Sequence, residues 1–133
     1  MTKVQLRSYR HIKIEKDNLD RTIKELEEVI YSPRIAQNDG QPHGSSSSGS
    51  IVERAAIKHA ELLERYQRKT IELAAAMLAI EEAIEVLDPT ERMLMRLYYI
   101  DGLTWEEVSY EINYSWRQVH RIHRRALEKL QSL

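Results

Sequence analysis

The hydrophobic and polar positions alternate with the period of an α-helix in two stretches of the first 87 residues. Between residues 1 and 31 the apolar side chains recur at spacings of three and four, interrupted once by Lys16. Residues 51–87 hold a second stripe of the same kind, in which His59 and Thr70 are the polar members. We therefore predict two long helices. Their stripes are Tyr9, Ile12, Leu19, Ile23, Leu26 and Ile30 in the first, and Val52, Leu63, Tyr66, Leu73, Met77, Ile80, Ile84 and Leu87 in the second.

Residues 32–50 separate these two helices and have no apolar period. Pro, Asn, Asp, Gly and Ser dominate the segment, so it cannot bury enough apolar surface to offset the entropy of ordering it. We predict a flexible linker, and a cloning remnant in its Ser-rich part is the weaker alternative. Two helices joined in this way should form a long antiparallel hairpin that resembles a coiled coil. Their narrow seams predict a homo-oligomer.

Three helix starts follow one another in residues 88–133. Each is an N-cap Asp, Thr or Ser with Glu or Gln three residues later, and they lie at 88–91, 104–107 and 115–118. Gly102 and Asn113 can adopt the left-handed backbone that ends the first two helices, near Ile100 and at Ile112. The third helix should run to about Gln131. Two helices joined by a turn of about three residues are typical of a helix-turn-helix domain. The predicted fold class is all-α.

The third of these helices has an apolar face and a basic face. Val119, Ile122 and Ala126 share one side with Leu130 and Leu133, so the basic side chains must face outward. Residues 115–133 contain five Arg or Lys against one acid, although the whole chain has a net charge of −1. A solvated charged face is the alternative, but the helix-turn-helix signals favour major-groove DNA contact. The candidate DNA-binding residues are Ser115, Trp116, Arg117, Gln118, His120, Arg121, Arg124, Arg125 and Lys129.

Position along this helix predicts a division of roles. Arg117 and Arg121 lie in its first two turns and should reach the base edges, whereas Arg125 and Lys129 should meet the DNA backbone. Of the two tryptophans, Trp105 shares a face with apolar neighbours and should be core. Trp116 lies between the core face and the DNA face, and both locations stay open.

Several other function classes are excluded or weakly supported. The chain has no Cys, so it has neither disulfides nor a thiolate metal site. His120 and His123 at a spacing of three are a weak metal pair, and we expect no metal or cofactor. The acids at 81, 82, 85, 88 and 91 should form a solvated face rather than a catalytic cluster, so we predict that the protein is not an enzyme. The chain has neither an apolar run long enough to span a membrane nor a signal-peptide core, so we expect a cytoplasmic protein.

Residues 103–130 resemble region 4 of the sigma-70 family factors. The resemblance rests on the Leu-Thr-x-Glu-Glu start at 103–107, on Ser115, Val119 and Ile122, and on the closing Ala-Leu-Glu-Lys-Leu at 126–130; upstream, the Leu-Asp-Pro-Thr-Glu-Arg at 87–92 also fits. Region 4 reads the −35 promoter element, and its base-reading positions fall here on Trp116, Arg117, His120 and Arg121. Sigma factors commonly have Arg where this chain has Trp116, so recognition should differ from the −35 consensus.

The layout of the whole chain is similar to that of the ArpU/RinA-like phage and prophage regulators of late transcription. This similarity implies a sequence-specific, double-stranded DNA-binding activator in the bacterial host cell, with host RNA polymerase as a further partner. Nothing resembles sigma region 2, so the chain should not act as a complete sigma factor. Two alternatives are open: a small terminase subunit, which would form a large ring on a packaging site, and a protein-only adaptor that mimics sigma on RNA polymerase.

Overall fold

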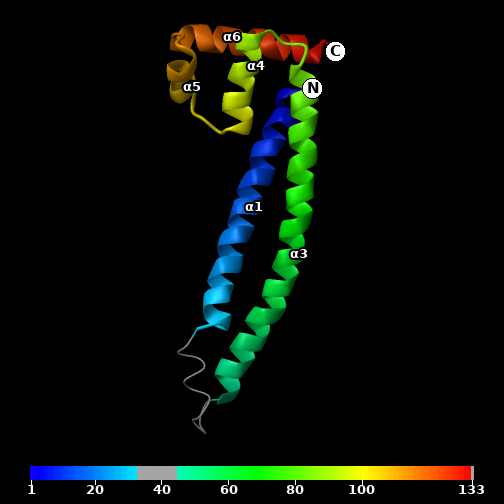
Figure 1. The fold of residues 1–133 in the computed structure, drawn as a ribbon, viewed down its shortest axis with the longest axis vertical. Helices are drawn as coiled ribbons and strands as arrows, with labels where there is room; N and C mark the ends of the chain where they lie inside the picture. The colour runs from blue at the N-terminus through cyan, green and yellow to red at the C-terminus, as the bar shows by residue number, and fades with distance from the viewer. Residues whose placement is uncertain (33–44, 133) are drawn as a thin grey trace. The chain divides into compact units, whose positions relative to one another are not determined.

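Helices are the only regular elements in the part of the chain that the structure describes. The computed structural model describes residues 1–32 and 45–132. In chain order the elements are α1 (Lys3–Ile30), α3 (Ser45–Ile84), α4 (Pro89–Met95), η2 (Arg96–Ile100), α5 (Trp105–Ile112) and α6 (Trp116–Gln131) (Figure 1). The predicted all-α fold class, a long helical hairpin followed by a helix-turn-helix, is confirmed.

The second long helix begins earlier than the sequence pattern indicated. Residues 45–50, predicted as part of the linker, are helical, because α3 starts at Ser45. Ser is less favourable in a helix than Ala by only about 0.5 kcal/mol per residue, and a helix that already exists can add residues at its end without a new nucleus. Low propensity alone therefore does not stop this helix. The rest of the predicted linker, residues 33–44, lies outside the described residues.

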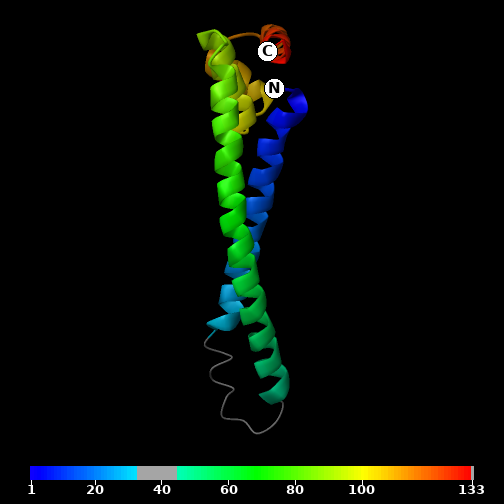
Figure 2. The same cartoon turned by 90° about the vertical axis from the view of Figure 1, so that its right-hand side faces the viewer.

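The chain divides into two compact units, and the first comprises residues 14–71. In it the second half of α1 and most of α3 run antiparallel (Figures 1 and 2). Ile23 is buried, as the predicted seam requires. In α3 the buried leucine is Leu62, whereas Leu63, which the sequence pattern placed in the seam, is 39% exposed, so that member of the predicted seam is wrong. Polar pairs flank the seam: Glu27 Oε1 to His59 Nε2 at 3.0 Å, Glu15 Oε2 to Lys69 Nζ at 2.6 Å, and Lys16 Nζ at 5.2 Å from the centre of the Tyr66 ring. Lys16, which interrupts the apolar stripe, thus covers an aromatic ring across the hairpin.

The second unit comprises residues 1–13 and 72–133, so the start of α1 belongs to the same unit as the helix-turn-helix. Leu6 is 0% exposed and Tyr9 is 3% exposed. The ammonium group of Met1 donates a hydrogen bond to the carbonyl oxygen of Leu130 at 3.0 Å. The unit is therefore larger than the predicted 88–133 domain. Its buried core is Leu6, Tyr9, Ile80, Ile84, Leu87, Leu94, Met95, Tyr99, Ile100, Val108, Val119, Ile122, Ala126 and Leu130.

The helix that was predicted to run to Ile100 widens at its end. α4 stops at Met95, and η2 is a turn of π-helix, in which the amide of Asp101 donates to the carbonyl of Arg96 at 3.0 Å. Gly102 then ends the element with φ at +73°, as its left-handed role predicts. The wide turn buries Tyr99 and leaves Tyr98 half-buried, with the two rings edge to face at 4.8 Å. η2 thereby supplies two consecutive aromatic rings to the helix-turn-helix.

Candidate nucleic-acid interface

α5 and α6 form the predicted helix-turn-helix, and local hydrogen bonds fix both helix starts. The hydroxyl of Thr104 accepts from the amide of Glu107 at 3.2 Å, and Asn113 ends α5 with φ at 57°. In the turn, the hydroxyl of Ser109 donates to the carbonyl of Tyr114 at 2.5 Å. The predicted bounds of both helices are confirmed, because each is set by a capping signal within four residues of it.

The first turn of α6 uses two of the candidate DNA-binding side chains for its own cap. The amide of Gln118 donates to Ser115 Oγ at 3.2 Å, and the amide of Ser115 donates to Gln118 Oε1 at 3.0 Å. This reciprocal pair is a capping box, which satisfies two backbone amides of the helix end. Ser115 and Gln118 therefore orient the helix start, and Trp116 and Arg117 are the side chains of this turn that are not engaged in the cap.

The basic face of α6 is directed away from the core. Val119, Ile122, Ala126 and Leu130 are buried on one side of the helix. Arg117, Arg121, Arg124 and Arg125 are exposed. Arg117, Arg121 and Arg124 lie at i, i+4 and i+7, so they form one row along the helix. None of these three forms an ion pair within the described chain, and their charges are free for an external anion.

Arg125 lies at the edge of this row, beside the start of α4. It lines a cavity of about 310 Å³ together with Asp88, Tyr114 and Ile122. The hydrogen bond from the amide of Glu91, followed by the nearby charges of Lys129 and Arg125, lowers the pKa of the Asp88 carboxyl. The charge of Arg125 is thus partly balanced within the domain, unlike the charges of the three other arginines.

Lys129, the last of the candidate residues, pairs with an acid of the protein. Its ammonium group lies 2.6 Å from Glu91 Oε1 and 3.9 Å from Asp88 Oδ2. Glu91 is only 1% exposed, so the prediction that it belongs to a solvated acidic face is wrong. Glu91 lies in the first turn of α4, on the side of the helix that faces the core, so its side chain is buried rather than solvated. Sequence reasoning missed this pair, because 38 residues separate its members.

Four aromatic rings contact one another in series, from Tyr98 in η2 to Trp116 at the start of α6. The ring of Tyr98 stacks on Trp105 at 3.8 Å with an interplanar angle of 13°. Trp105 contacts His120 at 4.9 Å, and His120 contacts Trp116 at 4.0 Å, all measured between ring centres. Trp105 packs against the core, as predicted, whereas Trp116 is 60% exposed. Trp116, for which the sequence left both the core and the surface open, therefore lies at the surface.

His123 lies on the same helix but belongs to the core. Its Nε2 lies 2.7 Å from the hydroxyl of Tyr99, and both side chains are buried. Burial, and then the charges of Lys3, His120 and Arg7, lowers the pKa of His123 to about 4, so the ring is neutral at neutral pH. Burial also raises the pKa of Tyr99 to about 12. His123 therefore adds no positive charge to the basic face of α6 at neutral pH.

Residues 1–32 and 45–132 contain no group of three His, Asp or Glu side chains placed to hold a metal ion. Within the same ranges, no helix has an apolar stretch long enough to cross a bilayer.

Comparisons with known proteins identify the segment that contains these helices. The family described as sigma-70, region 4 matches residues 83–132. The RNA polymerase sigma factor TcsR of Paraclostridium sordellii is 42% identical over 53 residues, which are 40% of this chain and 31% of that protein. TcsR from the strain ATCC 9714 of the same species is 40% identical over 52 residues, 39% of this chain and 31% of that protein. No solved structure gives a significant match.

These matches cover one part of the chain only. The chain spans about a third of the length of the curated relatives that it matches. They support a helix-turn-helix that is similar to sigma-70 region 4, and they support a DNA-binding regulator of transcription. The finer likeness to ArpU/RinA-like phage regulators is not confirmed by them.

Proposed function

We propose that this protein is a transcription regulator that binds double-stranded DNA in the major groove through α6. The observation that supports this function best is the row of Arg117, Arg121 and Arg124, which are exposed and form no ion pair within the described chain. Guanidinium groups on a capped helix suit both guanine edges and phosphates. Arg125 adds a further cation at the edge of the row. The sigma-70 region 4 match to the same helices supports the assignment.

The biological setting belongs to the same proposal. In the host bacterial cytoplasm, the regulator activates late genes of a phage or prophage, and it does so together with host RNA polymerase. Its layout, a hairpin followed by a region 4-like domain, supports this setting by its similarity to the ArpU/RinA-like regulators. The matched relatives are named sigma factors, and this chain matches only 31% of their length. Because no stretch of this sequence resembles sigma region 2, we propose a regulator without self-sufficient sigma activity.

A second candidate function is a protein-only adaptor of RNA polymerase. It is favoured by the names of the relatives, which are RNA polymerase sigma factors. The two functions differ in one measurable property. The regulator binds duplex DNA by itself, whereas the adaptor binds polymerase and has no affinity for DNA.

The experiment is a fluorescence anisotropy titration of the purified full chain. Labelled duplexes selected from a random pool serve as the probe, and a scrambled duplex serves as the reference. The proposed function predicts saturable binding with a clear preference for the selected duplex. Absence of binding to every duplex, together with binding to purified RNA polymerase, would establish the adaptor instead.

A further inference from the structure

Trp116 stands at the first position of α6, beside the arginine row, and its indole is 60% exposed. A ligand that covers an indole buries a large apolar surface, and Trp is accordingly enriched at interfaces. The neighbouring polar side chains, Ser115 and Gln118, are held in the capping box. Trp116 is therefore the apolar side chain that the first turn of α6 presents to a ligand.

The indole of Trp116 is also held in place from behind. His120 packs on it at 4.0 Å, Trp105 packs on His120 at 4.9 Å, and Tyr98 stacks on Trp105 at 3.8 Å. His120 Nε2 is buried and has no hydrogen-bond partner in the described chain, so through this atom the ring acts only as a spacer between the two indoles. A side chain that is fixed before binding loses less conformational entropy when it meets its ligand.

The major groove presents one apolar group to such a ring. Guanine, cytosine and adenine show only hydrogen-bonding groups there, whereas thymine adds its C5-methyl group. Residues at the start of a recognition helix are the ones that approach base edges. We propose that Trp116 selects thymine at one position of the target site by packing its indole against that methyl group. This contact rests on the proposed function, and it adds a specificity-determining residue to it.

The test removes the methyl group without changing base pairing. Each thymine of a duplex selected by the wild-type protein is replaced in turn by deoxyuridine, and affinity is measured by anisotropy. Burial of a methyl-sized group contributes about 0.8 kcal/mol, so the wild type should bind about fourfold more weakly when the contacted thymine is replaced. The Trp116→Ala variant should bind the thymine and uracil duplexes equally.

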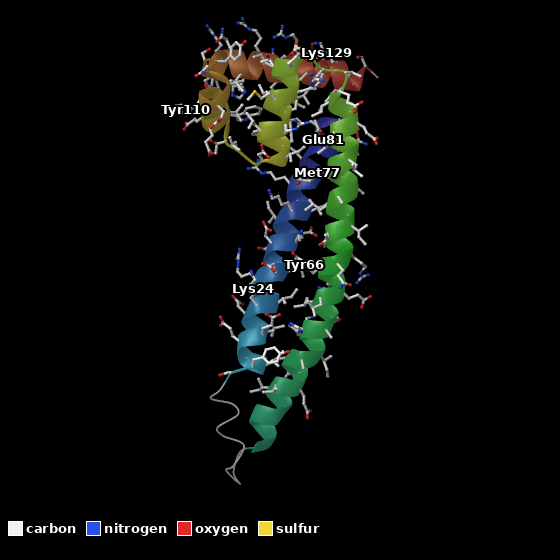
Figure 3. All side chains as sticks on the ribbon, in the orientation of Figure 1. Lys24, Tyr66, Met77, Glu81, Tyr110 and Lys129 are labelled. Carbon is white, nitrogen blue, oxygen red and sulfur yellow. The ribbon has the colours of Figure 1, made fainter. Side chains whose placement is uncertain are left out.

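Tyr110→Ala is the matched control. Tyr110 is an exposed aromatic residue, 82% accessible, that projects from α5 rather than from α6 (Figure 3). This variant should keep the wild-type ratio of thymine to uracil affinity, whatever its absolute affinity. Circular dichroism establishes that both variants are folded, and the wild-type uracil scan does not depend on either of them.

The outcomes separate this contact from the function on which it rests. A wild type that binds DNA but is indifferent to every uracil replacement overturns the contact alone. The same follows if Trp116→Ala keeps the fourfold preference for thymine. A wild type that binds no duplex overturns the proposed function and this contact together.

Discussion

At the scale of single residues, the stability of the helix-turn-helix unit depends on how Glu91 is compensated. Its side chain is almost fully buried, and one of its oxygens, Oε2, has no hydrogen-bond partner in the described chain. Lys129 supplies the compensating charge at Oε1. A buried charge whose partner is removed costs far more than an exposed one, because water cannot replace the partner. Since Lys129 itself is half exposed, water can reach part of the site and reduce this cost.

We predict that Lys129→Ala lowers the free energy of unfolding by about 1–3 kcal/mol. Arg125→Ala, one turn away and exposed, should change it by less than about 0.5 kcal/mol. Adding Glu91→Gln to Lys129→Ala should recover part of the loss, since the unpaired charge is gone. Urea denaturation of the three variants measures these differences. Equal stability of Lys129→Ala and Arg125→Ala would show that the pair does not stabilise the fold.

His123 makes a second prediction at this scale, on the pH dependence of stability. Its pKa is about 4 in the fold, against about 6.5 in an unfolded chain, so between these values the unfolded state binds the proton. Stability is therefore fully present above pH 6.5 and falls as the pH drops towards 4, by up to about 3 kcal/mol. The facing charges that strengthen this effect are Lys3, Arg7 and His120.

His123→Gln should flatten the stability curve between pH 7 and pH 5, and denaturation at several pH values measures this. Tyr99→Phe is the control, because it removes the hydrogen bond but leaves His123 buried and titratable. The prediction fails if His123→Gln and wild type lose stability in parallel over this range.

At the scale of elements, the first turns of α1 act as part of the helix-turn-helix unit. Leu6 and Tyr9 are buried in the same core as Val108, Val119 and Leu130. A unit made only of α4, η2, α5 and α6 is short, and small units bury too little surface to be stable alone. The N-terminal helix thus completes the core of the DNA-binding unit.

Leu6→Ala should destabilise this unit by about 2–5 kcal/mol, because it leaves a cavity where the side chain is fully buried. Val4→Ala tests the same helix at a position that is 77% exposed, and it should have almost no effect. Thermal denaturation followed by circular dichroism compares the two. Similar melting temperatures for both variants would mean that α1 does not contribute to this core.

The elements differ in how far the sequence could predict them. The bounds of α5 and α6 followed from Thr104, Asn113 and Ser115, because a cap is set by residues within one turn of it. The exposed arginine row followed from helical period in the same way. The burial of Leu6 in this core and the pairing of Glu91 with Lys129 could not be predicted from the sequence. Both depend on contacts between distant parts of the chain, and a helical period describes only neighbouring residues. The start of α3 was missed because propensity is a weak signal.

At the scale of the whole molecule, the long helices leave an apolar row uncovered. Ile71 and Leu78 lie seven residues apart on α3, and Ile57 lies two heptads before Ile71, with the exposed Glu64 at the position between them. Each of the three apolar side chains is more than 60% exposed. Such a row suits the packing of one helix against another. We propose that the protein is a homo-oligomer that associates through this row.

Sedimentation of the full chain measures the oligomeric state. The wild type should sediment as twice 15.7 kDa or more, and the Ile71→Glu/Leu78→Glu variant should sediment as a single chain of 15.7 kDa. Val4→Glu, which alters an exposed apolar residue of α1, should keep the wild-type mass. A wild type of 15.7 kDa at micromolar concentration would contradict the proposal.

The arginine row of α6 is tested most directly by comparing two variants that lose the same number of charges, one in α6 and one in another part of the chain. One variant changes Arg117, Arg121 and Arg124 to Gln, and its control changes Arg54, Arg65 and Arg68, which are exposed on α3. Binding of both to the selected duplex is measured across a range of salt concentrations. The first variant should lose about 100-fold in affinity, and the steep salt dependence of the wild type, a log–log slope of about −3 to −4, should become shallow. The control should bind as the wild type does. Equal binding by the two variants would contradict the assignment of α6 as the DNA-binding helix.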